Sequence, residues 1–151
     1  MAERRIFNET EAVLRAICRN VEHFDAHLAE LLDDMHQTLD KAQGVGLAAN
    51  QIGIRKRVFV LHNEDKRLEF VNPKITKAHG EIIDTEGCLS CPGLFGKVKR
   101  PEEIEIVAQD RTGKEFKLVM KGLDARIACH ETDHLVGKLF KDIAFDLEQK
   151  A

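Results

Sequence analysis

The chain has 151 residues, of which 43% are hydrophobic and 32% charged, a composition typical of a folded globular protein and not of a disordered or fibrous one. The formal net charge is -3 and basic and acidic residues are interspersed, so no basic stripe indicates a nucleic-acid site. No apolar run approaches the ~20 residues that span a bilayer, and the N-terminus lacks the apolar core of an export signal. We therefore expect one domain over residues 1–151, located in the cytoplasm, with reduced cysteines.

The N-terminal third predicts two helices. Between about residues 25 and 43, apolar side chains recur at three- and four-residue steps, which is the pattern of an amphipathic helix, and Gly44 is its expected end. A shorter helix is expected around residues 9–19, with its apolar residues on one side. We interpret both helices as scaffold.

The middle of the chain predicts short strands. The apolar and β-branched composition marks several segments, and Asn72-Pro73 is the expected end of one of them. Two segments alternate polar and apolar residues on either side of an Asp-Arg-Thr-Gly turn, which predicts a hairpin. The expected strands cover residues 58–61, 68–71, 81–84, 103–108 and 115–120, and the hairpin turn covers residues 110–113.

A closing helix is expected from about residue 123 to residue 136, between Gly122 and Gly137. Leu123 and Ile127 fall on the same stripe of this helix as two histidines further along. We therefore expect the helix to lie inside the domain with this stripe covered by sheet. Helices, then strands, then a helix in one unit indicate an α+β fold.

The closing helix carries the motif His130-Glu131-Thr132-Asp133-His134. Residues four apart lie one above the other on a helix, so the two imidazoles can hold one metal ion. Glu131 borders the ion without being needed as a ligand, which is the position for a general base. His23 and His27 have the same spacing, but no glutamate follows the first of them, and we expect this pair to have a solvated or partly buried structural role.

The third metal ligand admits more than one interpretation. Cys88 follows Gly87, where the backbone can approach other elements closely, and it is the favoured ligand. A metallopeptidase would take a downstream ligand, for which the sequence offers Asp142 and Glu148. A structural zinc site would combine Cys88 and Cys91 with the two histidines, although the long separation from the histidines disfavours a compact zinc finger.

Residues 44–51 contain two glycines near a helix end, but they lack the lysine of a phosphate-binding loop and the preceding strand of a dinucleotide fold. We interpret this segment as closely packed backbone that lines a cleft and aims the amide of Gln51 into it. A neutral amide donor beside a metal suits a developing oxyanion.

Three segments, taken in order, resemble the signature stretches of the peptide deformylases. They are Gly-Val-Gly-Leu-Ala-Ala-Asn-Gln at residues 44–51, Glu-Gly-Cys-Leu-Ser at residues 86–90, and the motif at residues 130–134. The resemblance extends over nearly the whole chain. It implies an α+β fold in which antiparallel strands surround the C-terminal metal-binding helix, with the N-terminal helices packed outside.

The resemblance also implies an activity and a cofactor. The expected cofactor is Fe2+ held by Cys88, His130 and His134, a ligand set that also suits Zn2+, Ni2+ or Co2+. The implied substrates are N-formylmethionyl peptides, that is, nascent chains at the bacterial ribosome. Hydroxide formed with Glu131 as base would attack the formyl carbon, and Glu131 would return the proton to the leaving amine as formate departs.

By the same resemblance, two groups donate hydrogen bonds to the oxyanion: the backbone N–H of Leu89 and the side chain of Gln51. Val45, Gly46 and Gly87 match positions that line the substrate channel, where an extended peptide would add like an extra strand. No direct nucleic-acid site and no membrane association are expected.

The sequence departs from the family pattern at four positions. Cys129 stands where a glutamine is usual, Cys91 where an aliphatic residue is usual, and Ala12 where a proline is frequent. Phe95 lies about where many members carry an arginine near the substrate. These changes leave the ligands and the base intact and bear on the shape of the cleft.

Overall fold

The structure, a computed structural model, describes residues 2–150. Its α-helices are α1 (Ala26–Ala42) and α2 (Gly122–His134), and short 3-10 turns cover Ala12–Arg15, Ala49–Ile52 and Phe140–Asp142. The strands are β1 (Gly46–Ala48), β2 (Val58–Asn63), β3 (Lys66–His79), β4 (Ile82–Cys88), β5 (Cys91–Arg100), β6 (Glu103–Gln109), β7 (Glu115–Lys121) and β8 (Phe145–Gln149).

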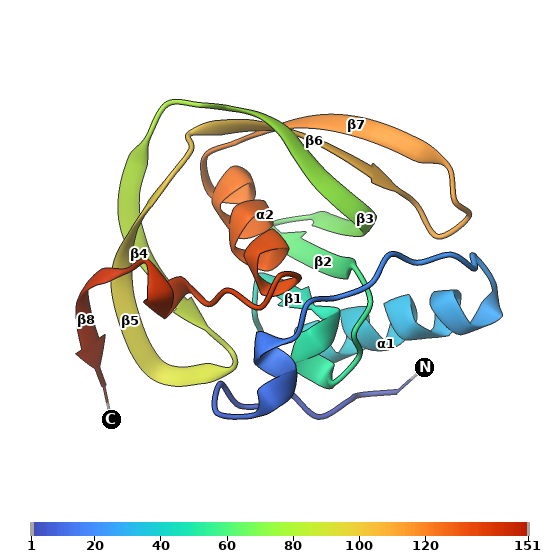
Figure 1. Cartoon of the computed structure of the whole chain (residues 1–151), viewed down its shortest axis with the longest axis horizontal. Coiled ribbons are helices and arrows are strands. Elements are labelled where there is room, and N and C mark those ends of the chain that lie inside the picture. Colours follow the sequence, from blue (N-terminus) through green and yellow to red (C-terminus); the bar gives the residue numbers. More distant parts are fainter. Residues whose placement is uncertain (1, 151) are drawn as a thin grey trace.

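These elements form an α+β fold with two antiparallel sheets (Figure 1). One sheet has the strand order β1-β2-β3-β6-β7 and the other has the order β4-β5-β8. Helix α2 lies at the centre of the molecule between the two sheets, and α1 packs against the outside of β1 and β2 (Figure 1). The expected fold class, with antiparallel strands around the last helix, is confirmed.

Helix α1 begins and ends close to the predicted positions. The Asp25 side chain accepts hydrogen bonds from two backbone N–H groups of the first turn. The left-handed residue at the C-terminal end is Gln43, with φ of 56°, so the predicted stop at Gly44 is wrong by one residue. His23 and His27 are exposed, which is the first of the two expected alternatives. The buried face consists of Leu28, Leu31, Leu32, Asp34, Met35, Thr38 and Leu39.

The helix predicted at residues 9–19 is wrong. Only the 3-10 turn Ala12–Arg15 forms there. The Cys18 N–H donates to the Leu135 carbonyl at 2.9 Å, and Arg19 forms a parallel bridge with Lys56. These tertiary hydrogen bonds hold the end of the segment extended, and they override a local apolar spacing that is compatible with a helix. Of the two expected N-terminal helices, α1 alone packs outside.

The predicted hairpin is confirmed as β6 and β7, with Ile106 opposite Leu118. Gly113 in its turn has φ of 90°, a value that favours glycine. The strand predicted to end at Asn72-Pro73 instead continues to His79, through a bulge at which Asn72 has φ of 51°.

Several strands lie outside the predicted segments. Residues 81–84 overlap only the first part of β4, which continues to Cys88. The strands β1, β5 and β8 were not predicted at all. Pro92, Gly93 and Gly96 weaken the strand signal of β5, which forms because it pairs on both sides with β4 and β8.

Helix α2 ends at His134, earlier than the predicted residue 136, and it is buried on several sides. Ala125, Ile127 and Ala128 belong to the largest apolar core cluster. Leu123 is 52% exposed, so the expectation that its whole stripe is covered by sheet is wrong at this residue. No helix within residues 2–150 is both long enough and apolar enough to cross a membrane.

Candidate metal centre

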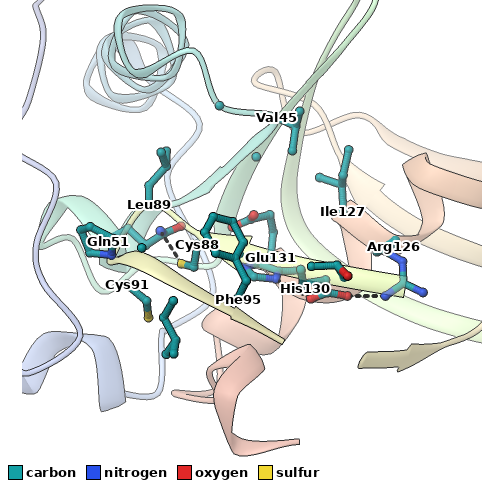
Figure 2. Close-up of a pocket in the computed structure, with 18 of the residues that line it drawn as sticks. Val45, Gln51, Cys88, Leu89, Cys91, Phe95, Arg126, Ile127, His130 and Glu131 are labelled. Carbon is teal, nitrogen blue, oxygen red and sulfur yellow. Dashed lines mark hydrogen bonds and ion pairs between the residues drawn. The ribbon is translucent and has the colours of Figure 1, made fainter. Parts of the chain in front are cut away.

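A cavity of about 450 Å³ opens between the edges of the two sheets. Its walls include the backbone around Val45 and Gly46 at β1, and around Gly87 and Leu89 at β4 (Figure 2). The cavity therefore brings together segments that are about 40 residues apart in the sequence. All three residues expected to line the substrate channel, Val45, Gly46 and Gly87, lie in its wall.

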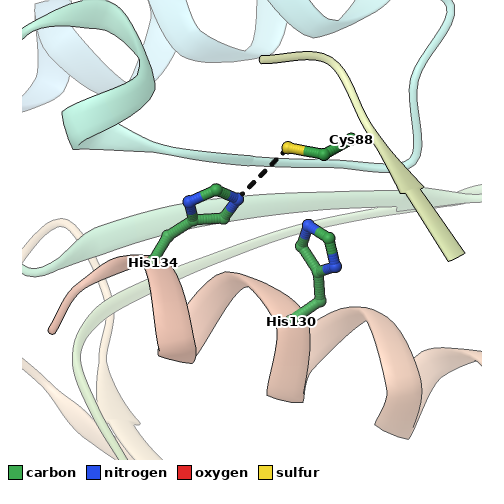
Figure 3. Close-up of side chains that lie close together, drawn as sticks. All are labelled: Cys88, His130 and His134. Carbon is green, nitrogen blue, oxygen red and sulfur yellow. Dashed lines mark hydrogen bonds between the residues drawn. The ribbon is translucent and has the colours of Figure 1, made fainter. Parts of the chain in front are cut away.

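Three potential metal ligands converge beside this cavity (Figure 3). Cys88 comes from the end of β4, and His130 and His134 come from successive turns of α2. Their ligand atoms all lie within 4.8 Å of one another, and Cys88 Sγ is 3.4 Å from His134 Nε2. This is the one such group of His, Cys, Asp or Glu side chains found in the described part of the chain.

The alternative third ligands lie elsewhere. Asp142 forms an ion pair with Arg15 at 2.6 Å, and Glu148 is exposed on β8. Cys91 is buried near Cys88 but does not belong to the ligand group. The geometry thus favours neither a downstream third ligand nor a closed site with two cysteines and two histidines.

The ring of His130 is held by a carboxylate on β4. Its Nδ1 lies 2.9 Å from Glu86 Oε1, which leaves Nε2 free for a metal ion. Glu86 also accepts hydrogen bonds from Arg100 and Arg126. Burial would raise the pKa of Glu86, but the hydrogen bonds from Arg100 and His130 overcome this effect and hold the pKa at about 2. Glu86 is therefore ionised at neutral pH, and it contacts the side of the His130 ring that does not face the other candidate ligands.

No role for Glu86, Arg100 or Arg126 was inferred from the sequence. Besides Glu86, Arg100 contacts Asp133 on α2, with its Nη1 2.7 Å from Asp133 Oδ2. Arg126 also donates hydrogen bonds to the Ile82 and Val98 carbonyls. A signal for Glu86 was available, because residues two apart on a strand share a face and Glu86 is two residues before Cys88. The two arginines contact residues that are distant in the sequence, so no local sequence pattern could have predicted their partners.

Glu131 is buried beside the ligand group, and its Oε1 has no hydrogen-bond partner among residues 2–150. Burial raises the pKa of this carboxyl group, against the opposing effect of the two imidazoles. A Cβ atom added to Gly46 would lie 2.5 Å from Glu131 Oε2, so the glycine makes room for the carboxylate at the cavity wall. The position suits a group that exchanges a proton with a ligand in the cavity.

The amide of Gln51 is oriented toward the same place. Its Oε1 accepts a hydrogen bond from the Ala48 N–H at 2.9 Å, which fixes the amide so that Nε2 points to the site. Nε2 lies 3.5 Å from Cys88 Sγ (Figure 2). It also lies 3.2 Å from Ser90 Oγ. The segment interpreted as a cleft lining is strand β1 followed by a 3-10 turn that carries Gln51.

The donor set fits a transition-metal ion. Hydrogen bonding by the Cys91 thiol and by the two imidazoles lowers the pKa of Cys88 well below its usual range, although burial opposes the shift. One thiolate and two imidazoles that converge in this way match the ligands of zinc and iron(II) sites that keep a position open.

Fold and site together define an α+β protein with a candidate three-ligand metal centre next to a buried carboxylate. Residues 3–150 match the family model for polypeptide deformylase. A peptide deformylase from Caldicellulosiruptor bescii is 47% identical over 142 residues, which are 94% of this chain and 86% of that protein.

Solved structures agree with this match. The crystal structure of a peptide deformylase from Legionella pneumophila superposes with a TM-score of 0.92 at 42% identity, covering 96% of this chain and 88% of that one. The peptide deformylase from Thermotoga maritima has a TM-score of 0.93 at 33% identity, covering 95% and 99%. The chain therefore belongs to the polypeptide deformylase family and is an enzyme, a hydrolase. The resemblance noted in the sequence is confirmed.

Proposed function

We propose that this enzyme removes the formyl group from the N-terminal formylmethionine of newly made polypeptides and releases formate. The observation that carries the proposal is the convergence of Cys88, His130 and His134 beside the buried Glu131, at the wall of an open cavity. The proposed substrates are nascent chains, which places the reaction at the ribosome in the bacterial cytoplasm. The proposed catalytic unit is a single domain over residues 1–151.

Cys88, His130 and His134 are the proposed ligands of one divalent ion, Fe2+ in the first place, with Zn2+, Ni2+ or Co2+ suited to the same donors. A bound ion of this kind acidifies water and polarises a carbonyl group. Glu86 would hold the His130 ring in the tautomer that presents Nε2 to the ion.

Glu131 is the proposed general base and acid. Its carboxylate accepts a proton from the attacking water and later delivers a proton to the amine that leaves as formate is released. Its burial supports this role, because desolvation raises the pKa of the carboxyl group and so makes the carboxylate a stronger base.

Two hydrogen-bond donors are proposed for the oxyanion that develops on the formyl oxygen. They are the Gln51 amide, already turned toward Cys88, and the backbone N–H of Leu89. Each such donor is worth ~3 kcal/mol of barrier lowering. Val45, Gly46 and Gly87 are the proposed backbone wall along which the extended peptide lies.

The direct test is formate release. The protein is loaded with iron(II) under anaerobic conditions, its metal content is measured, and it is then incubated with a formyl-Met tripeptide and with the matching acetyl-Met tripeptide as control. We expect formate from the first peptide only, with every peptide bond left intact. Absence of formate from a metal-loaded sample, or cleavage within the peptide chain, would contradict the proposal.

A further inference from the structure

Two cysteines face each other across the turn between β4 and β5. Cys88 ends β4, Cys91 begins β5, and the two are direct partners in the strand register. A bulge produces this pairing, because Gly87 is opposite Phe95 and the next pair along is Cys88 with Cys91, which leaves residues 92–94 outside the pairing with β4. In a regular register Cys91 would instead lie at the tip of the turn. The bulge therefore brings two sulfur-bearing side chains together.

The spacing of directly opposite strand residues suits a disulfide bond. Their Cα atoms lie about 4.5–5.5 Å apart in antiparallel pairs, and disulfides join Cα atoms about 4.4–6.8 Å apart. The two side chains also lie on the same side of the hairpin, because Cys88 packs against the apolar cluster that Cys91 forms with Val98 and Phe140. Both cysteines line the cavity of the candidate metal centre (Figure 2). A bond between the two sulfur atoms therefore requires no change in strand pairing.

The two sulfur atoms differ in reactivity. Cys88 must be a thiolate to bind a metal ion, and the thiolate is also the form that reacts with peroxides. Cys91 is only 3% exposed, which shields its thiol from oxidants in solution. The S–H of Cys91 donates a hydrogen bond to Cys88, and this contact is the largest cause that holds the pKa of Cys88 below its usual range. The buried thiol is thus already directed at the reactive sulfur atom.

A carboxylate also contacts Cys91. The backbone N–H of Glu9 donates to the Ser90 carbonyl at 2.9 Å, which ties residue 9 to the hairpin. The Glu9 side chain pairs with Lys141 through Oε1, whereas Oε2 is buried without an N–H or O–H partner among residues 2–150. A hydrogen bond from the Cys91 thiol is the main cause that lowers the pKa of Glu9. Glu9 is therefore placed to take the proton of Cys91 when its sulfur reacts.

We infer that Cys88 and Cys91 form a reversible disulfide when hydrogen peroxide reaches the cavity. The thiolate of Cys88 attacks the O–O bond, its sulfur is oxidised by two electrons to a sulfenic acid, and hydroxide leaves. The Cys91 sulfur then bonds to the Cys88 sulfur, and the sulfenic hydroxyl leaves as water with the proton that Glu9 took from the Cys91 thiol. Overall, two thiols and one peroxide give one disulfide and two molecules of water.

The consequence for activity rests on the proposed function. A disulfide sulfur is not a thiolate, so the candidate centre would keep only His130 and His134 and would release its metal ion. A dithiol restores both cysteines by exchange. With an aliphatic residue at position 91, as is usual in the family pattern, the sulfenic acid has no such partner and is oxidised irreversibly to a sulfinic acid. Cys91 therefore makes the loss of the ligand Cys88 reversible.

The test uses the zinc-loaded protein, because zinc has no redox chemistry of its own. Samples receive a small excess of hydrogen peroxide, then iodoacetamide to block the remaining thiols, and finally trypsin. Residues 78–97 form one tryptic peptide that contains Cys88 and Cys91 and no other cysteine, so the mass of this peptide reports their state. A chromogenic chelator measures zinc release, and dithiothreitol tests whether the oxidation is reversed.

The variants Cys91→Val and Cys91→Ser remove the second sulfur atom, and Cys18→Val is the matched control, because Cys18 is also buried but lies in a different core cluster. We expect the peptide of the wild-type protein and of Cys18→Val to lose two hydrogen atoms, with release of zinc, and dithiothreitol to restore most of the zinc binding. In both Cys91 variants the peptide should gain two oxygen atoms, and the recovered zinc binding should be about tenfold lower. Glu9→Gln should form the disulfide at least about tenfold more slowly.

A wild-type peptide that gains oxygen instead of losing hydrogen, or a Cys91 variant that recovers as fully as the wild-type protein, overturns the inference. Failure of the proposed function would look different. Unoxidised, metal-loaded wild-type protein would then release no formate, while the peptide masses and the zinc release would still follow the expected pattern.

Discussion

His130 Nδ1 lies 2.9 Å from Glu86 Oε1, so a carboxylate on one sheet orients a candidate metal ligand on the central helix. The same carboxylate accepts hydrogen bonds from Arg100 and Arg126. We therefore expect both the metal affinity and the stability of the protein to depend on the buried Glu86 side chain. The two effects are separable by experiment.

Replacing Glu86 by glutamine should weaken metal binding by about 10- to 100-fold, because the neutral amide supports the imidazole less well than the carboxylate does. It should also lower the free energy of unfolding by about 3 kcal/mol, because two guanidinium groups lose their buried partner. Competition with a chelator gives the affinity, at a temperature where circular dichroism shows folded protein. Glu81→Gln, an exposed change just before β4, is the control. Equal metal affinity in the two variants would refute the orienting role.

Replacing Glu131 by glutamine should lower kcat by about 10²- to 10⁴-fold with the metal content unchanged. The same variant should be more stable than the wild-type protein when both are metal-free, because it removes a buried carboxyl group whose Oε1 has no partner. Formate release, metal analysis and urea unfolding check the three statements. Full activity in this variant would exclude Glu131 as the base.

Removing the metal should abolish activity and leave most of the fold intact. The ligands come from elements that are also held by the apolar core and by the Glu86 ion pairs, so the centre is not the main support of the structure. Circular dichroism before and after chelation, and activity after iron(II) is restored, test this prediction. Unfolding upon chelation would instead indicate a structural site.

A methyl group at residue 46 should disturb the carboxylate of Glu131, the proposed base. The added Cβ in Gly46→Ala would lie 2.5 Å from Glu131 Oε2 and 2.8 Å from a methyl carbon of Ile127, both well inside contact distance. We expect at least a tenfold loss of kcat and a stability loss of about 1–3 kcal/mol. Gly113→Ala is the comparison, because its φ of 90° costs stability at a turn far from the cavity. Equal activity in both variants would contradict the prediction.

The stability of the α1 face should fall in mild acid. His62 Nε2 lies 2.7 Å from His36 Nδ1, and burial, together with the nearby Arg67, lowers the pKa of His62 to about 4. The unfolded chain takes up a proton near pH 6.5 and the folded chain only near pH 4, so the stabilisation is present above pH 6.5 and lost as the pH falls toward 4.

We expect this loss to amount to about 2 kcal/mol between pH 7 and pH 4.5. It should be reduced in His62→Gln and retained in His27→Gln, which changes an exposed histidine at the start of α1. Urea unfolding at several pH values gives the comparison. A wild-type slope that persists in His62→Gln would assign the loss to other groups.

Local sequence patterns were sufficient to predict an element or motif wherever one short segment contains all the residues that define it. The apolar spacing of α1, the alternation in β6 and β7 and the His-Glu-x-x-His spacing on α2 each depend on neighbours within one element, so the sequence predicted them. Cys88 was also singled out as a candidate ligand, because it follows Gly87 and its thiolate suits a divalent ion. By contrast, β8 pairs only with β5, which lies far from it along the chain, and β5 is held between β8 and its neighbour β4.

By itself, then, the sequence determined the fold class and indicated three candidate ligands and a candidate base, since their residue types and spacings are properties of the chain. Only the tertiary structure decided what surrounds them. The Glu86 network with Arg100 and Arg126 and the room that Gly46 leaves for Glu131 both join residues from separate elements. Such contacts depend on how the sheets and the helix pack, and no local periodicity encodes that packing.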